Sequence, residues 1–199
     1  VDRLVKEGQK IIILDNFVSG KRSNLSHHLK KDVEVINLDI SNTKKLDKYL
    51  KDVSYVFHLA GLAEIVPSIK NPKKYFINNV LGTLNMLEAA KKVKVKKFIY
   101  AASSSCYGSP KKIPTPETEK IHTQHPYAFT KFLGEEAVIK YAKFFKMPNI
   151  SCRFFNVYGP RLNITGQYGA VFSNFLIQKK KKRPLTIVGN GKQTRDFIH

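Results

Sequence analysis

Five short apolar runs recur along the chain, and polar residues separate them. They span Lys10–Asn16, Val33–Asp39, Val53–Gly61, Lys97–Ser105 and Ile150–Pro160. The runs are rich in Val, Ile and Phe, and most of them end in polar residues. Runs that are apolar throughout are typical of strands in a parallel sheet that is covered on both faces.

Helical patterns fall between these runs. From Ile77, apolar residues recur at Val80, Leu81, Leu84 and Leu87, which is the spacing of one helix face. A second helix is predicted over Tyr127–Phe145, with prolines near its start and beyond its end, and a third over "SNTKKLDKYL", with a Ser or Asn cap. Because strands and helices alternate, the predicted fold is α/β, a doubly wound, Rossmann-like parallel sheet.

The alternation also predicts the domain organisation. Residues 1–158 are expected to form a dinucleotide-binding domain, and residues 159–199 the start of a small substrate-binding lobe, because the alternation weakens after Gly159. The segment "VDRLVKEG" fits the tail of the first helix of such a fold. The first strand and the glycine-rich phosphate loop are therefore expected to precede Val1. We expect a piece of a longer protein that is inactive by itself.

The composition narrows the class of protein. The 199 residues carry 35 basic and 15 acidic side chains, a net charge of +20, which suits an anionic substrate, a nucleic acid or a membrane surface. The lysines are dispersed, so a solvated basic surface is favoured, and a non-catalytic nucleic-acid-binding module stays as the remote alternative. Two cysteines predict neither disulfides nor a metal site. With no signal sequence and no apolar run of about 18 residues, a cytoplasmic protein is expected.

Polar residues at the strand ends predict where ligands bind, because the ligands of open parallel sheets lie outside the carboxyl ends of the strands. Asp15 ends the first apolar run, which would be the second strand of a complete dinucleotide fold. A carboxylate there holds the ribose hydroxyls of the adenosine and repels a 2′-phosphate, which favours NAD over NADP. A turn or helix-capping aspartate is an equally good interpretation of Asp15 alone.

The segment "HPYAFTK" contains a candidate reaction centre. Tyr127 and Lys131 are four residues apart, so they share one helix face. A neighbouring ammonium lowers the pKa of a phenol, which could then take a proton from a hydroxyl group. Ser103, Ser104 and Ser105 stand at the end of the preceding strand, where a serine can bind the same oxygen. The alternatives are a solvated helix face and loop serines.

Taken together, the motifs "VFHLAGLAEIVPSIKNP", "FIYAASSSCYG", "HPYAFTK" and "RFFNVYGPR" resemble the extended short-chain dehydrogenase/reductase superfamily. The nearest branch is that of the NAD-dependent UDP-sugar 4-epimerases. The resemblance implies NAD as cofactor, a UDP-sugar as substrate, a transient 4-keto sugar, and a homodimer paired through helices matching Asn78–Lys91 and Tyr127–Phe145. UDP-glucuronate epimerases and decarboxylases of the same superfamily are the alternative. Dehydratases carry Asp-Glu where this chain has Ser104-Ser105, so dehydration is disfavoured.

The resemblance also implies the roles of individual residues. Ser103, Tyr127 and Lys131 match the catalytic positions, and Lys131 would also hold the nicotinamide ribose. Besides Tyr127 and Lys131, the implied cofactor-binding residues are Asp15, Asn16, Ser19, Gly20, Asp39, Ile40, Leu59, Ala60, Gly61, Asn78 and Phe155. The implied substrate-binding residues are Ser103, Asn156 and Arg195. The guanidinium of Arg195 suits a phosphate because it donates two parallel hydrogen bonds.

Overall fold

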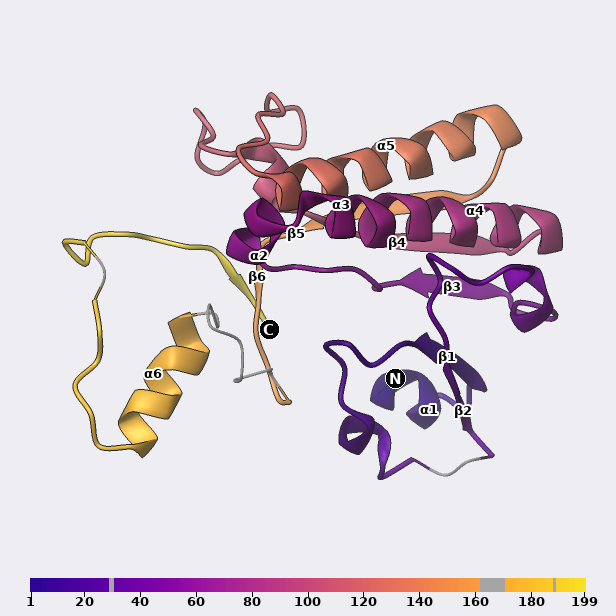
Figure 1. Ribbon diagram of the computed structural model, residues 1–199, viewed down its shortest axis with the longest axis horizontal. Coiled ribbons are helices and arrows are strands. Elements are labelled where there is room, and N and C mark those ends of the chain that lie inside the picture. The colour runs from indigo at the N-terminus through magenta and orange to yellow at the C-terminus, as the bar shows by residue number, and fades with distance from the viewer. Residues whose placement is uncertain (29–30, 162–170, 188) are drawn as a thin grey trace. The chain divides into compact units, whose positions relative to one another are not determined.

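The computed structural model describes residues 1–28, 31–161, 171–187 and 189–199 (Figure 1). The chain divides into two compact units, Val1–Arg153 and Phe154–His199. The first unit holds five of the strands and the longest helices, α4 and α5. The two units are described separately.

A two-stranded parallel sheet opens the first unit. Helix α1 (Asp2–Lys6) leads into β1 (Ile11–Asp15), which pairs with β2 (Val33–Asn37) from Ile11↔Val33 to Asp15↔Asn37. A short 3-10 turn, η1 (Arg22–Leu25), lies between the two strands in sequence. Because the strands are parallel and in register, the residues that follow Asp15 and Asn37 emerge at the same edge.

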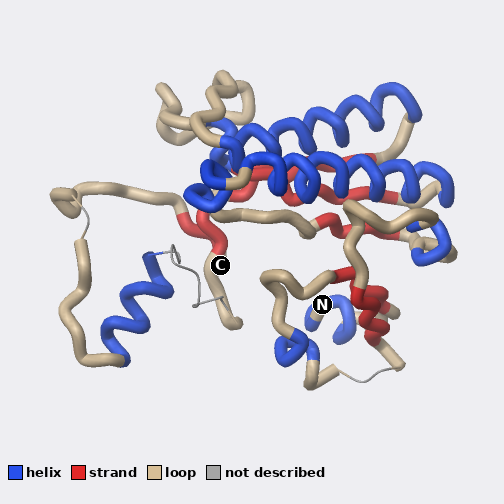
Figure 2. Tube along the Cα trace, viewed as in Figure 1, coloured by secondary structure: helices blue, strands red, loops and turns tan. Residues whose placement is uncertain are grey.

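A three-stranded sheet follows in the order β3-β4-β5, with bounds Tyr55–His58, Lys97–Ser103 and Asn149–Phe154. Strand β3 runs parallel to β4. Helices α4 (Gly82–Val93) and α5 (Pro126–Phe145) lie along this sheet (Figure 2). The prediction of strands covered on both faces is wrong for β3 in the described part of the chain. Val56 and His58 are buried on the helix side, whereas Tyr55 and Phe57 are more than half exposed.

Short helical elements connect these strands and helices. They are η2 (Leu46–Tyr49), α2 (Ile65–Lys70), α3 (Pro72–Tyr75), the π-helix η3 (Phe76–Leu81) and the 3-10 turn η4 (Ser104–Tyr107). The helix predicted over "SNTKKLDKYL" is only the 3-10 turn η2. Its preceding residue, Lys45, has a left-handed backbone with φ of 58°, so no Ser or Asn cap begins a helix there.

The core of the first unit lies between α4, α5 and the helix-facing side of β3 and β4, and includes Leu87, Ala90, Phe98, Tyr100 and Val138. The helix face predicted from Ile77 and Leu81 is partly wrong, because both side chains are more than a third exposed. Asn79 and Thr83 are buried in the same region instead. The side-chain polar groups of both residues form hydrogen bonds, so they can be buried without a charged partner.

The second unit contains β6 (Asn156–Val157), helix α6 (Val171–Lys180) and β7 (Phe197–Ile198), with β6 parallel to β7. The strand predicted over Ile150–Pro160 is therefore divided into β5 and β6. Rings of Tyr158, Phe172 and Phe197 pack together beside the β6–β7 pair. Across both units, none of the described helices combines the length and apolarity that a membrane span requires.

Candidate active site

The first turn of α5 fixes the backbone of Tyr127. His125 precedes the helix, and its Nδ1 accepts a hydrogen bond of 3.2 Å from the Ala128 N–H. The Tyr127 N–H donates to the Ser68 hydroxyl of helix α2 at 3.1 Å. Ser68 is fully buried and donates in turn to the Ile65 carbonyl. Two of the backbone donors that a helix start leaves unpaired are thus satisfied, and Tyr127 is held in place. No pattern in the sequence indicates this role of Ser68.

The carboxyl end of β4 brings Ser103 to Tyr127. The Tyr127 hydroxyl donates to Ser103 Oγ at 3.2 Å. Ser103 Oγ also accepts from the Ser105 N–H at 3.2 Å and donates to Ser105 Oγ at 3.0 Å. Ser103 is buried, and the turn η4 begins directly after it. The two residues predicted to share a substrate oxygen therefore already share a hydrogen bond across 24 positions of sequence.

Lys131 lies one helical turn beyond Tyr127 and is only 7% exposed. Its Nζ lies 4.3 Å from the centroid of the Tyr100 ring. It also lies 3.8 Å from the position that a Cβ at Gly61 would take. Among the described residues no hydrogen bond leaves this ammonium. Burial lowers the pKa of Lys131 to about 8, and the Glu135 carboxylate opposes that shift.

The pKa of Tyr127 shifts in the direction opposite to the predicted one. Burial raises the pKa of the phenol above its ordinary value, and the hydrogen bond with Ser103 lowers it by less. Lys131 is not among the groups that shift it. Desolvation disfavours the phenolate, and the lysine is itself desolvated, so the chain alone keeps Tyr127 protonated at neutral pH.

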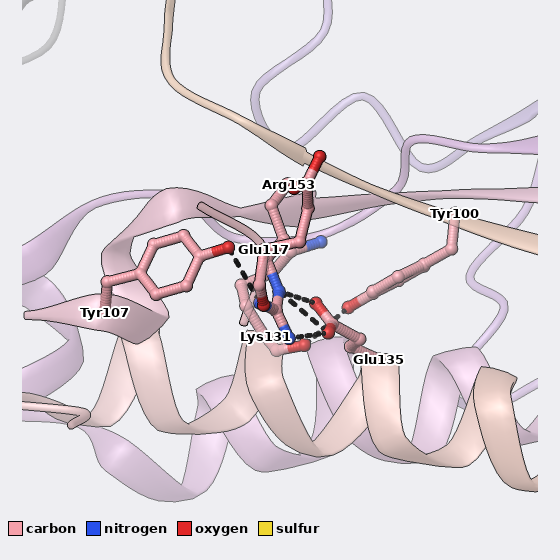
Figure 3. A network of polar contacts seen from close by, with 6 residues as sticks. All are labelled: Tyr100, Tyr107, Glu117, Lys131, Glu135 and Arg153. Atoms are coloured by element: carbon pink, nitrogen blue, oxygen red, sulfur yellow. Dashed lines mark hydrogen bonds and ion pairs between the residues drawn. The ribbon is translucent and has the colours of Figure 1, made fainter. Parts of the chain in front are cut away.

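A buried ion pair supports the next turn of α5 (Figure 3). Glu135 is 2% exposed, and its Oε1 lies 2.5 Å from Arg153 Nη2 and 2.9 Å from Arg153 Nε. Arg153 Nη1 donates to the Tyr107 hydroxyl at 2.8 Å and to the Glu117 carbonyl at 3.0 Å. The network joins α5, β5 and the end of η4, the three elements around Ser103 and Lys131. Sequence reasoning missed it.

Tyr100 packs directly against the same helix. Its hydroxyl donates a hydrogen bond of 3.2 Å to the Lys131 carbonyl, and both residues are drawn in Figure 3. A Cβ at Gly134 would overlap that hydroxyl, so glycine is needed for the close approach. Burial raises the pKa of Tyr100 well above its ordinary value, which keeps this phenol a neutral donor.

The carboxyl ends of β1 and β2 bring four predicted cofactor-binding residues together. Asn16 Nδ2 donates to Asp39 Oδ2 at 3.3 Å, and Asp15 Oδ1 accepts from the Phe17 N–H at 2.7 Å. A Cβ at Gly20 would lie 2.8 Å from Asp15 Oδ2, so the loop can fold over that carboxylate only because residue 20 is glycine. Hydrogen bonds from Ser41 hold the pKa of Asp39 below its ordinary value.

The loop after β3 contains Leu59, Ala60 and Gly61, all of them exposed. Asn79 holds this loop: its Oδ1 accepts from the Leu62 N–H at 2.7 Å, and its Nδ2 donates to the Leu62 carbonyl and to Thr130 Oγ1. The Nδ2 of Asn78, the predicted cofactor-binding residue in η3, donates to the Lys74 carbonyl of α3. Asn79 is therefore the asparagine that joins the loop to α5. Its four-residue spacing from Thr83 was the available signal.

The remaining predicted residues have other surroundings within their own units. Ser19 is exposed in its loop, and the Ile40 side chain packs in the core, where it would contact a Cβ at Gly82. Phe155, Asn156 and Arg195 belong to the second unit. In that unit Asn156 Nδ2 donates to the Asp196 carbonyl at 2.9 Å, and Arg195 Nη1 donates to the Thr194 carbonyl at 2.7 Å.

Replacing Lys131 by methionine is expected to stabilise the folded chain by about 3 kcal/mol at pH 7, because it removes a desolvated ammonium. The folded pKa of about 8 lies below the ordinary 10.5, so the cost of the charge is full below pH 8 and vanishes above about pH 10.5. Urea unfolding of both proteins between pH 7 and 10.5 measures this gain. A gain that grows with pH, or a loss at pH 7, would contradict the burial of an unpaired charge.

The chain is similar to known proteins along its whole length. The model of the NAD dependent epimerase/dehydratase family matches residues 1–199. A Methanocaldococcus jannaschii protein is 35% identical over the whole chain, which spans 64% of that protein. UDP-glucuronic acid decarboxylase 4 of Arabidopsis thaliana is 37% identical over 99% of the chain and 44% of its own length.

A solved structure has the same fold. It is a UDP-N-acetylglucosamine 4-epimerase from Methanobrevibacter ruminantium M1 in complex with UDP-N-acetylmuramic acid. The TM-score is 0.95 at 35% identity, and the match covers 100% of this chain and 63% of the other. The predicted α/β Rossmann-like fold is confirmed. The chain spans less than two thirds of the length of each of these relatives.

Proposed function

Because the chain belongs to the NAD-dependent epimerase/dehydratase family, we propose that the full-length protein inverts the configuration of a UDP-sugar at C4, with NAD as cofactor and a 4-keto sugar as transient intermediate. The observation that carries this proposal is the 3.2 Å hydrogen bond between the Tyr127 and Ser103 hydroxyls, with the buried ammonium of Lys131 one turn away. Residues 1–158 would bind NAD, and residues 159–199 would begin the sugar-nucleotide lobe.

The residues of the chain suit NAD. Lys131 is 7% exposed, and its Nζ donates no hydrogen bond to any of the described residues. Ribose hydroxyls are acceptors that such an ammonium needs. Gly61 leaves open the space beside it that a Cβ would occupy. At the other edge, the Asp15 carboxylate beneath Gly20 suits the two ribose hydroxyls of the adenosine. Asp15, Asn16, Gly20 and Asp39 would hold the adenosine end, and Leu59–Gly61 with Lys131 the nicotinamide end.

In the proposed reaction Tyr127 moves the proton. Its Oη takes the proton of the C4 hydroxyl and later returns it to the same oxygen, while Ser103 Oγ holds that oxygen by a hydrogen bond. Bound NAD would supply the acceptor and donor of the C4 hydride and a positive charge that favours the phenolate. Lys131 is the chain's own cation on this helix face. Burial raises the pKa of Tyr127, and Lys131 is not among the groups that shift it. The positive charge of the bound cofactor would therefore be needed to bring Tyr127 into use as a base.

The proposal extends to substrate and assembly. Asn156 and Arg195 would bind the sugar nucleotide, with Arg195 at a phosphate, and the net charge of +20 would attract the diphosphate. Ser104 and Ser105 stand in the turn after Ser103 and offer no acid to expel water, which favours epimerisation over dehydration. Two adjacent exposed rings at the end of α5, Phe144 and Phe145, suit the proposed homodimer through α4 and α5.

Incubation of the purified full-length protein with NAD and UDP-N-acetylglucosamine, UDP-glucose or UDP-glucuronate tests the proposal. We expect proton NMR to show conversion of at least one of them to its C4 epimer, with no net formation of NADH. UDP-N-acetylglucosamine is the favoured substrate, because the structural relative with a TM-score of 0.95 is an epimerase of that sugar. Failure to epimerise any of the three would contradict the proposal.

The second candidate is decarboxylation of UDP-glucuronate, and the 37% identity to the plant decarboxylase favours it. The same hydroxyl pair would serve, because oxidation at C4 also precedes loss of a carboxylate at C5 as carbon dioxide. Release of carbon dioxide and formation of a UDP-pentose from UDP-glucuronate, without a C4 epimer, would establish this reaction in place of epimerisation.

A further inference from the structure

A cluster of two histidines and one aspartate lies in the β1–β2 half of the first unit. His28 Nε2 lies 2.7 Å from Asp2 Oδ1, and His27 Nε2 lies 3.2 Å from the same oxygen. The three ligand atoms all lie within 4.8 Å of one another. The prediction of no metal site rested on the two cysteines and did not take in the adjacent histidines of the "SHHL" segment.

Adjacent residues do not ordinarily share a partner, and here a tight turn makes it possible. The His28 N–H donates to the Leu25 carbonyl at 3.1 Å, and the Ser26 hydroxyl donates to the Ser23 carbonyl at 2.9 Å. This turn brings the two imidazole rings to a centroid distance of 4.1 Å with 40° between their planes. Both rings then face Asp2, which lies 25 residues away in the first turn of α1.

From this convergence we propose a binding site for a divalent transition metal of the zinc class, with Asp2, His27 and His28 as its ligands. Imidazole nitrogen and carboxylate oxygen are the donors that such ions take, at about 2.0–2.2 Å. Tetrahedral ligands at these lengths are about 3.3 Å apart. The separations of 2.7 and 3.2 Å between Asp2 Oδ1 and the two nitrogens require little movement to reach that value.

The exposure of the side chains fits a three-ligand site with a fourth position open to water. The His28 side chain is 7% exposed, whereas those of His27 and Asp2 are 48% and 37% exposed. His28 is thus a fixed ligand, and solvent reaches the cluster from the side of the other two.

The metal would act as a clamp. Asp2 is on α1, and the two histidines follow η1. They end the segment that starts at Asp15 and contains Gly20. A shared ion would fix both ends of this segment, because β1 holds Asp15 and the metal holds His28 to α1. None of its three ligands is assigned to NAD or to the UDP-sugar, so the metal site does not rest on the proposed function.

Isothermal titration of the full-length protein with ZnCl₂ at pH 7.5, in a buffer that does not chelate, tests the proposal. We expect one Zn²⁺ per chain, a higher melting temperature with Zn²⁺, and reversal of that shift by EDTA. Replacing a ligand should raise the Kd at least about tenfold, as in His28→Ala and in Asp2→Asn. Co²⁺ in place of Zn²⁺ should show the visible absorption of a low-symmetry site without thiolate.

Two variants keep the test decisive. Asp2→Asn retains an oxygen that can accept the imidazole hydrogen bonds but removes the carboxylate ligand. It therefore separates loss of a metal ligand from loss of a hydrogen bond. This variant can still be tested if His28→Ala fails to fold. His122→Ala removes an exposed histidine outside the cluster and should leave Zn²⁺ binding unchanged. Absence of Zn²⁺ binding by the unaltered protein, or an equal Kd in Asp2→Asn and His122→Ala, would overturn the site and leave a hydrogen-bonded cluster.

Discussion

Tyr127→Phe in the full-length protein is expected to lower kcat by about 10²- to 10⁴-fold, which is the range that general acid–base catalysis contributes. The change removes one oxygen and leaves the ring that stacks beside His125. KM should change little, because the phenol would act on the reacting hydroxyl and not on the nucleotide. Steady-state kinetics with the substrate identified by NMR measures both constants.

Tyr141→Phe is the matched control, because it removes a hydroxyl from the same helix. The Tyr141 hydroxyl donates to Glu88 at the surface of α4 and α5, away from Ser103. Its kcat should stay within about twofold of the unaltered protein, as most surface substitutions have small effects. Full activity in Tyr127→Phe, or equal losses in the two variants, would refute the role of Tyr127 as acid and base.

Arg153→Met is expected to destabilise the protein by about 3 kcal/mol, because it leaves Glu135 as a buried carboxylate without its cation. Glu135 is 2% exposed and receives three hydrogen bonds from the guanidinium. The Glu135 carboxylate in turn raises the pKa of Arg153. Tyr107 and the Glu117 carbonyl would lose their donor in the same variant. Urea unfolding monitored by circular dichroism measures the loss.

Two comparisons isolate the ion pair. The double variant Glu135→Leu with Arg153→Met should recover most of the loss, since no unpaired charge remains. Lys91→Met breaks the exposed pair between Lys91 and Glu88, which are joined at 2.8 Å, and should cost less than about 1 kcal/mol. The double variant could instead lose as much stability as the two single variants together, or Arg153→Met and Lys91→Met could lower the free energy of unfolding equally. Either result would show that burial does not determine how much the Glu135–Arg153 pair contributes to stability.

Local patterns in the sequence predicted much of the fold. Strands β1, β2 and β4 and helix α5 begin and end near the predicted residues, because their apolar runs and the flanking prolines are local signals. The division of the fifth run at Phe155 and the short η2 had no such signal. The exposed side of β3 could not be read from the chain either, since exposure depends on which elements cover a strand.

Hydrogen bonds between distant residues explain what the sequence did not predict at the candidate site. The Tyr-x-x-x-Lys spacing predicted Tyr127 and Lys131, and the three strand-end serines were predicted to lie near them. The family resemblance singled out Ser103, and the structure brings Tyr127 and Ser103 together. Asn79 was missed because its hydrogen-bond partners, Leu62 and Thr130, are distant in the sequence, and without them a buried asparagine is not expected. The direction of the Tyr127 pKa shift was predicted wrongly because burial was not visible in the residue spacing.

A crystal structure of the full-length protein with NAD and the bound UDP-sugar tests the central claim most directly. We expect the Tyr127 hydroxyl and Ser103 Oγ both to lie within about 3.2 Å of the sugar O4, with Lys131 Nζ hydrogen-bonded to a ribose hydroxyl of the nicotinamide half. A sugar whose O4 lies out of reach of Tyr127, or a Lys131 ammonium that turns away from the cofactor, would contradict it.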